Sequence, residues 1–246
     1  ARRSSVMDYG RVVLGIGNPG PEYEDTRHNA GFLVLDRLAE RLGLRFHRLE
    51  RRGPDGQRLF SGRVKARVAL VEGCEVAGGE PEPGFLLAKP LTYVNLSGDV
   101  AGPLLRAKGL GPESLFVVLD DLNLPLGRVR VRPAGRAGVP QRLASLGPAL
   151  GTNAFPRLRL GIGRPAEADP RVSALTGGGD TVDFVLARFL PDEREVLVSV
   201  LERCADVVLQ WRDGAPIEDL MGRHNGYVAV PEHGDGLEGD PGESES

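Results

Sequence analysis

The sequence predicts one α/β domain, a three-layer α/β sandwich around a mixed, mostly parallel central sheet. Two observations lead to this fold class. Short apolar runs that end at glycine or proline alternate with stretches whose apolar residues recur at helical spacing. Strands that alternate with helices in this way build a sheet covered by helices on both faces. The chain has 246 residues and no apolar run near the ~20 residues that span a bilayer, which excludes a membrane protein.

The first half of the chain gives clear signals for individual elements. Residues 12–14 form a fully apolar run closed by Gly15, which is typical of a buried central strand. Apolar residues then repeat at helical spacing over 32–42, and Gly43 ends that helix. Two further strands are expected at 63–71 and 84–88.

The second half continues the alternation. Ser97 is expected to cap a helix running to about residue 108, in which Pro103 would introduce a kink or delay the start. Arginine alternates with valine over 128–132, which predicts a half-exposed strand with its arginines on one face. The remaining strands are expected at 115–119 and 157–162, and the remaining helices at 140–150 and 192–212.

The domain is expected to cover residues 11–225 without an internal linker, and the helix at 192–212 is expected to cover part of the cleft. Residues 1–10 are expected to be a flexible N-terminus. Residues 1–5 contain no apolar segment, so a secretory signal is not expected there. Residues 227–246 are rich in Gly, Glu and Ser, so they are expected to form an acidic disordered tail.

The charge of the chain is unevenly distributed. The formal net charge is −3, yet no Asp or Glu lies between Asp121 and Glu167, where there are eight arginines. An acid-free arginine block suits a polyanion such as nucleic acid, through phosphate contacts and counterion release. A solvated strand face in an arginine-rich protein is an equally good interpretation of this block alone.

Several familiar sites are not expected. Gly15, Gly17 and Gly20 match the dinucleotide-binding pattern G-x-G-x-x-G, but that pattern works only when a helix opens directly after it. Here Pro19 and Pro21 intervene, and the helical pattern begins ten residues later. No P-loop, nucleophile-elbow or H-E-x-x-H motif is present. The two cysteines show no metal-ligand spacing, so neither a metal nor a cofactor is expected.

Polar residues follow the apolar strands at several places. In an open α/β sheet, ligands collect beyond the carboxyl ends of the strands. His28, Asp120, Asn18 and Asn95 would therefore supply a base, a carboxylate that orients it and two amide donors. Each has a simpler interpretation as a helix cap, a turn residue or a strand end. Tyr93 is either ordinary core or a ring on which a base stacks.

Taken together, these segments resemble the bacterial-type peptidyl-tRNA hydrolase family. The resemblance covers about residues 11–223 and keeps the order and spacing of the family's motifs. The matching segments read VVLGIGNPGPEYEDTRHNAGF, KPLTYVNLSG, VVLDDLNLPLG and FPRLRLGIGRP. The resemblance implies a metal-free, cytoplasmic, monomeric esterase. Its substrate would be peptidyl-tRNA that has left the ribosome, recognised through its acceptor stem and CCA end and cut at the ester between peptide and terminal ribose.

Site residues follow from this resemblance position by position. His28 would be the general base that activates water, Asp120 would orient it, and Asn18 would contact the peptide next to the ester. Of the residues that would bind the substrate or the tRNA, three lie beyond strand ends, one lies in the loop discussed next and two lie in the arginine block: Tyr23, Tyr93, Asn95, Gln141, Arg132 and Arg159.

One loop departs from the family's pattern. The family has a glycine-rich segment ending G-G-H-N-G, whereas this chain reads AGRAGVPQR over residues 134–142. Aligned without a gap from Asp120, the family's His falls on Pro140 and its substrate-binding Asn on Gln141. Proline fixes φ and lacks an amide donor, and glutamine places its amide one methylene farther from the backbone.

Two functional hypotheses remain open from the sequence. Either Gln141 takes the place of the family's asparagine in an active hydrolase, or the chain binds tRNA or structured RNA without cutting it, as chloroplast relatives that assist splicing do. Because Asn18, His28, Asn95 and Asp120 are all present, we expect an active enzyme. A small-molecule esterase would have no need of the arginine block.

Overall fold

The computed structural model describes residues 9–50, 52, 57–60, 64–73, 84–133, 143–165, 170–172 and 181–229. Its centre is a seven-stranded sheet with the order β2-β3-β4-β1-β5-β7-β6. The four neighbouring strands β4, β1, β5 and β7 are parallel, and antiparallel pairs lie at both edges. The mixed sheet is therefore confirmed. The strands are β1 Arg11–Gly15, β2 His47–Arg48, β3 Ala66–Val71, β4 Phe85–Pro90, β5 Leu115–Asp121, β6 Val129–Arg132 and β7 Arg157–Gly161.

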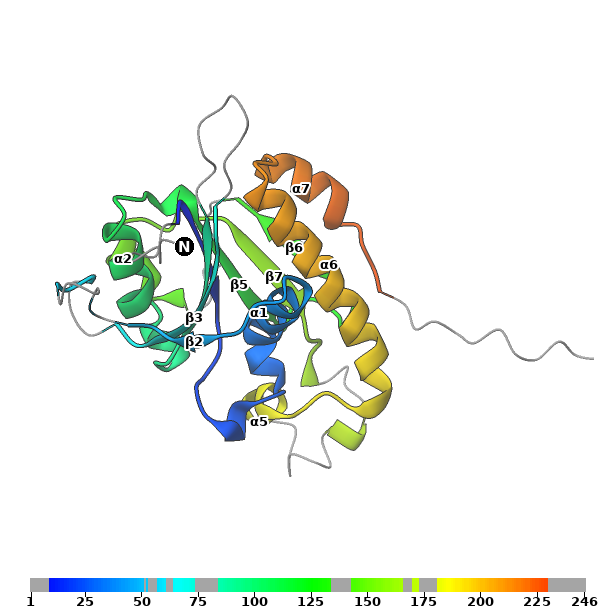
Figure 1. The fold of residues 1–246 in the computed structure, drawn as a ribbon. Helices are drawn as coiled ribbons and strands as arrows, with labels where there is room; N and C mark the ends of the chain where they lie inside the picture. Colours follow the sequence, from blue (N-terminus) through cyan, green and yellow to red (C-terminus); the bar gives the residue numbers. More distant parts are fainter. Residues whose placement is uncertain are drawn as a thin grey trace, which may run out of the picture.

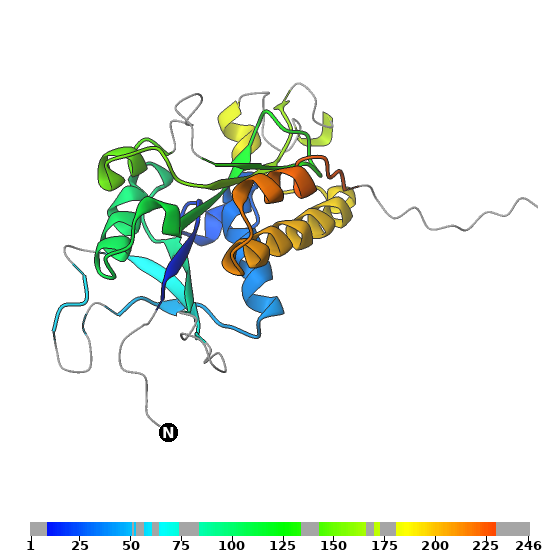
Figure 2. The same ribbon diagram turned by 90° about the horizontal axis from the view of Figure 1, so that it is seen from above.

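Helices cover both faces of this sheet (Figures 1 and 2). In β1, Val13 belongs to the hydrophobic cluster with α1 and α6, whereas Val12 and Leu14 belong to the cluster with α2. Alternate residues of a strand point to opposite faces, so the two clusters define three layers. One side carries α1 Ala30–Arg41, α5 Thr181–Leu186, α6 Arg194–Arg212 and α7 Ile217–His224; the other carries α2 Gly98–Arg106 and α3 Leu146–Leu150.

The start of α1 lies directly on the sheet because Gly31 has no side chain. A Cβ atom there would be 2.4 Å from the carbonyl oxygen of Val118 and 2.5 Å from that of Ile16. Any larger residue would push α1 away from β1 and β5. The close approach brings the short helix η2 Arg27–Asn29, which precedes α1, against the end of β5.

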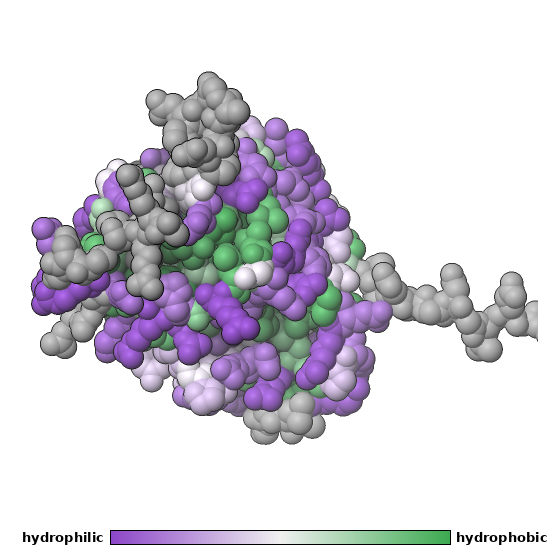
Figure 3. Space-filling model, in the orientation of Figure 1, coloured by the Kyte–Doolittle hydropathy of each residue, from purple (hydrophilic) through white to green (hydrophobic). Residues whose placement is uncertain are grey.

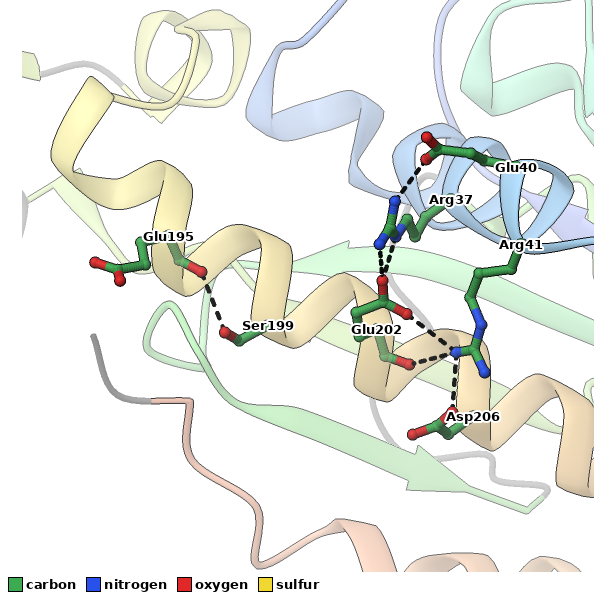
Figure 4. Close-up of polar contacts among 7 residues, drawn as sticks. All are labelled: Arg37, Glu40, Arg41, Glu195, Ser199, Glu202 and Asp206. Carbon is green, nitrogen blue, oxygen red and sulfur yellow. Dashed lines mark hydrogen bonds and ion pairs between the residues drawn. The ribbon is translucent and has the colours of Figure 1, made fainter. Parts of the chain in front are cut away.

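Ion pairs connect α1 to α6 on the surface (Figure 4). Arg37 binds Glu202 and also Glu40, the latter at 2.6 Å. Arg41 binds Glu202 at 3.1 Å and Asp206 at 2.9 Å. Elsewhere on this side of the molecule, hydrophilic side chains surround a hollowed area of hydrophobic surface (Figure 3).

Some expected helix boundaries are wrong. Pro103 lies inside α2 without delaying its start, since the helix already begins at Gly98. Ser97 directly precedes α2 as expected, but its Oγ donates to the carbonyl of Val94 at 2.9 Å and does not cap the helix. Within the described residues, the helix expected over 140–150 consists of α3 alone. Residues 144–145 form a turn before it, and residues 134–142 lie outside the description.

The last long helix also starts later than expected. Its first residues form the 3-10 helix η7 Pro191–Glu193, and α6 proper begins at Arg194. Of the expected flexible N-terminus 1–10 and the expected tail 227–246, residues 1–8 and 230–246 lie outside the described residues. The described parts pack on the domain: the hydroxyl of Tyr9 donates to the carbonyl of Leu104 at 2.9 Å, and the backbone N–H of Ala229 donates to the carbonyl of Gly127 at 2.9 Å. Across the described part of the chain, none of the helices combines the length and the apolar character that crossing a membrane requires.

Candidate active site

The carboxyl ends of β4, β1 and β5 meet at the point where the strand order reverses. β1 lies between β4 and β5, and the helices that follow β1 and β4 leave on opposite faces of the sheet. This arrangement opens a crevice beyond the strand ends, where α/β proteins bind their ligands. The loop after β1, η2, and the 3-10 helix η3 Val94–Leu96 after β4 all lie there.

His28 and Asp120 lie close together at the carboxyl ends of these strands. Asp120 is the penultimate residue of β5, and its carboxylate is fully buried. Its Oδ2 lies 3.4 Å from Nδ1 of His28, whose side chain is 13% exposed. This distance is long for a hydrogen bond, as is common in active sites without substrate. A carboxylate at Nδ1 favours the tautomer protonated there, which makes Nε2 the basic nitrogen.

Asn18 connects three segments of the site. Its backbone N–H donates to Oδ1 of Asn29 at 2.8 Å, and Nδ2 of Asn29 donates back to the carbonyl of Asn18 at 3.0 Å. The side-chain Oδ1 of Asn18 accepts from the backbone N–H of Val94 at 3.1 Å. Asn29 is buried, and sequence reasoning did not select it. The available signal was its place directly after His28.

The predicted substrate-binding residues near the crevice are accessible. Tyr93, which precedes η3, is 59% exposed, so the interpretation of Tyr93 as a core residue is wrong. Asn95 within η3 is exposed as well. Tyr23 ends the 3-10 helix η1 Pro21–Tyr23 and is half-buried. The bond from Asn18 to Val94 fixes the backbone between Tyr93 and Asn95 relative to the loop after β1.

Four arginines of the block lie on one face of the β6–β7 pair. Arg130 is opposite Arg159 and Arg132 is opposite Arg157, while the valines between them are buried. Neither Arg130 nor Arg132 has a carboxylate partner among the described residues. Arg157 is buried, and burial followed by the charge of Arg159 lowers its pKa.

Arg159 differs from the two arginines of β6. Its Nη2 lies 2.7 Å from Oδ2 of Asp121, and its side chain is 23% exposed. Adjacent residues of β5 point to opposite faces of the sheet, so Asp120 contacts His28 and Asp121 pairs with Arg159. Sequence reasoning assigned Arg159 to phosphate contacts and did not identify this internal partner.

Two remaining expectations concern Gln141 and α6. Gln141 and Pro140 lie outside the described residues. The helix α6 packs on α1, β6 and β7, and its covering of the cleft stays a prediction. Among described residues, no group of three or more His, Cys, Asp or Glu side chains lies close enough together to hold a metal ion.

Comparisons with known proteins agree on one family. The family model described as peptidyl-tRNA hydrolase matches residues 12–231. The chain is 43% identical over 199 residues to the peptidyl-tRNA hydrolase of Akkermansia muciniphila, covering 81% of this chain and 87% of that protein. It is 40% identical over 216 residues to that of Thermus thermophilus, covering 87% and 96%. The crystal structure of peptidyl-tRNA hydrolase from Acinetobacter baumannii is similar with a TM-score of 0.66 at 26% identity, covering 92% of this chain and 100% of that one.

Proposed function

The chain belongs to the peptidyl-tRNA hydrolase family, and on that premise we propose how its own residues carry out the reaction. It is an enzyme that hydrolyses the ester bond of peptidyl-tRNA and releases peptide and tRNA. The observation that carries the assignment of roles is the pairing of His28 with the buried carboxylate of Asp120 beside the loop of Asn18. The proteins compared above are all named hydrolases, and no described feature favours RNA binding without hydrolysis.

His28 acts as the general base. Its Nε2 takes a proton from water while the water oxygen attacks the ester carbonyl carbon, and the carboxylate of Asp120 stabilises the imidazolium that forms. The tetrahedral intermediate then expels the ribose oxygen, which takes the proton from His28. The new carboxylic acid loses its proton to solvent. This sequence balances with water as the only co-reactant.

Asn18 orients the acyl side of the ester. Because its Oδ1 accepts from Val94, its Nδ2 is the part of the amide that can donate to a substrate carbonyl. Gln141 presents an equivalent amide in place of the family's asparagine. Asn29 holds the backbone of Asn18 in place through two hydrogen bonds.

The nucleic acid lies over the exposed aromatic residues and the arginine face. Tyr93 and Tyr23 offer rings to the CCA end, and Asn95 offers hydrogen bonds to it. Arg132, with Arg130 beside it on β6 and Arg159 on β7, binds phosphates of the acceptor stem. We place this enzyme in the cytoplasm as a monomer.

The test is release of the acyl group from N-acetyl-aminoacyl-tRNA. The wild-type protein should release it in buffer with EDTA, and His28→Ala should lower kcat by about 10²–10⁴. Asp120→Asn should lower kcat as well, while circular dichroism shows both variants folded. Full activity of His28→Ala would overturn the assignment of the base. Absence of turnover with salt-sensitive tRNA binding would establish the non-hydrolytic alternative.

A further inference from the structure

A cavity of about 610 Å³ lies beside the active site on the side of β4. Asn18 and Asn29 line it at one end, and α1 contributes Phe32. The edge strand β2 contributes Arg48, and its neighbour β3 contributes Arg67. Neither His28 nor any described residue of α6 lines it. The cavity is therefore continuous with the loop that holds Asn18 but separate from the His28–Asp120 pair.

The strand order places this cavity opposite the arginine face. His28 and Asp120 lie at the end of β5, with β7 and β6 on one side and β1, β4, β3 and β2 on the other. An ester has a ribose side and an acyl side that extend in different directions from the bond that breaks. The arginine face would bind the phosphates of the acceptor stem. Asn18, which orients the acyl side, also lines the cavity, so a peptide that continues past Asn18 reaches it.

The charges in the cavity suit a peptide better than a second segment of RNA. Arg48 and Arg67 are directly opposite each other in the β2–β3 pair, an unfavourable placement of like charges. Neither Arg48 nor Arg67 has a carboxylate partner among the described residues. Glu24 and Asp25 also line the cavity, and neither has a cationic partner among the described residues. Positive and negative groups therefore both face the cavity, and the carboxylates would repel a polyanion.

Two further features support a binding role. Phe32 and Phe46 line the cavity, and the ammonium of Lys89 lies 5.5 and 4.4 Å from the centres of their rings. A volume of this size is in the ordinary range for ligand sites. Asp25, which also lines it, has a φ of 60° and is the one non-glycine residue with positive φ in the described ranges. Backbone strain of this kind concentrates at functional sites.

We propose that this cavity binds the peptide of peptidyl-tRNA, beyond the residue that is esterified to the ribose. The peptide contacts Phe32 and Phe46, and its acidic side chains pair with Arg48 and Arg67. This proposal rests on the proposed function, because it names where the peptide of that substrate lies. It assigns Arg48 and Arg67 a preference for acidic peptides.

Kinetics with three substrates test the charge preference. These are N-acetyl-aminoacyl-tRNA and two peptidyl-tRNAs with the same esterified residue, one carrying an acetylated glutamate-rich tripeptide before it and one a lysine-rich tripeptide. Arg48→Glu gives Arg67 a carboxylate directly opposite, so the variant should fold. It should lower kcat/KM for the glutamate-rich substrate, relative to the N-acetyl substrate, by about fivefold, the upper end for one exposed ion pair. The kcat/KM for the lysine-rich substrate, relative to the N-acetyl substrate, should not fall in this variant.

Arg194→Glu is the matched control, since Arg194 is an exposed arginine at the start of α6, outside the cavity. It should leave the ratio between substrates unchanged. Equal ratios in wild type, Arg48→Glu and Arg194→Glu would overturn the proposal while leaving hydrolysis of the N-acetyl substrate, and hence the proposed function, intact.

Cross-linking provides a readout that does not depend on turnover. A peptidyl-tRNA with a photoreactive phenylalanine two residues before the esterified residue is irradiated with His28→Ala protein, and the modified tryptic peptides are identified. Cross-links to Phe46 or to α1 near Phe32 are expected. Cross-links confined to η3 would overturn the proposal, and so would cross-links from deacylated, photoreactive tRNA to the cavity.

Discussion

The guanidinium of Arg27 is buried and lies 2.5 Å from the carboxylate of Glu193. Arg27 directly precedes His28, the proposed general base, in the chain. Its guanidinium is also 4.8 Å from the ring centres of both Phe184 and Phe189. The backbone N–H of Arg27 donates to Ala187 at 2.9 Å. These contacts fix η2 to the segment between α5 and α6, and so help to set the position of His28.

Replacement of Arg27 should therefore destabilise the protein. Arg27→Met leaves the carboxylate of Glu193, which is 23% exposed, without its cation, and loss of a hydrogen bond to a charged group costs about 2 kcal/mol in the free energy of unfolding. Arg171→Met is the control, since its pair with Asp192 is 59% exposed on both sides and should cost less than about 1 kcal/mol. Urea unfolding followed by circular dichroism measures both. Equal losses in the two variants would contradict the structural role of Arg27.

Asn29 should affect catalysis through the position of Asn18. Asn29→Ala removes both hydrogen bonds to the backbone of Asn18, and at about 1 kcal/mol each their loss should lower kcat/KM by about 10- to 30-fold. Asn29→Asp keeps the acceptor and should give an intermediate value. Asn153→Ala, at an exposed position, should match wild type. An Asn29→Ala enzyme with normal kcat/KM would show that Asn18 holds its position without this support.

His224 should make stability depend on pH. The side chain is buried at the end of α7, with Nε2 3.2 Å from Oε1 of Gln210 on α6. Burial lowers its pKa most, Arg203 and Arg223 lower it further, and Asp206 acts in the opposite direction. In the unfolded chain the pKa is about 6.5, so between the two pKa values the unfolded state binds a proton that the folded state does not.

The sign of this effect is that acid destabilises the fold. The contribution of His224 to the free energy of unfolding is complete above about pH 6.5 and is lost as the pH falls from there towards the lowered folded pKa. His224→Gln should therefore lose less stability than wild type between about pH 7.5 and pH 5.5 in urea unfolding. His47→Gln, at an exposed position on β2, should behave like wild type. Parallel pH curves for all three proteins would exclude His224 as the source.

Much of the fold and the centre of the site follow from local patterns. The apolar run before Gly15 predicted β1, and the helical spacing from Phe32 predicted α1, because burial on one or both faces leaves a period in the sequence. His28 and Asp120 are 92 positions apart, yet each lies at the carboxyl edge of the sheet. Topology alone therefore predicted that they would be close.

The contacts that depend on register could not be predicted in the same way. Whether Asp120 or Asp121 contacts His28 depends on the face of the sheet to which each of the two side chains points. The partner of Asp121 depends on the register between β5 and β7. Two adjacent acids have the same local sequence signal. Likewise, Asn29 is the usual kind of residue before a helix, and only the folded loop brings it to the backbone of Asn18.

Arg132 and Arg159 should differ in their effect on tRNA binding, although both belong to the arginine block. Arg132 has no carboxylate partner within the described residues, so Arg132→Gln should weaken binding of deacylated tRNA and reduce the slope of log K against log salt concentration by about 0.9. Arg159 is paired with Asp121 at 2.7 Å, so much of its charge is already balanced inside the protein. Arg159→Gln should change the slope less, and it should lower stability because Asp121 loses its partner.

Fluorescence titrations with labelled tRNA over a series of KCl concentrations measure the slopes, with Arg194→Gln as the control for loss of one surface charge. A larger change in slope for Arg159→Gln than for Arg132→Gln would show that the tRNA displaces Asp121 from Arg159.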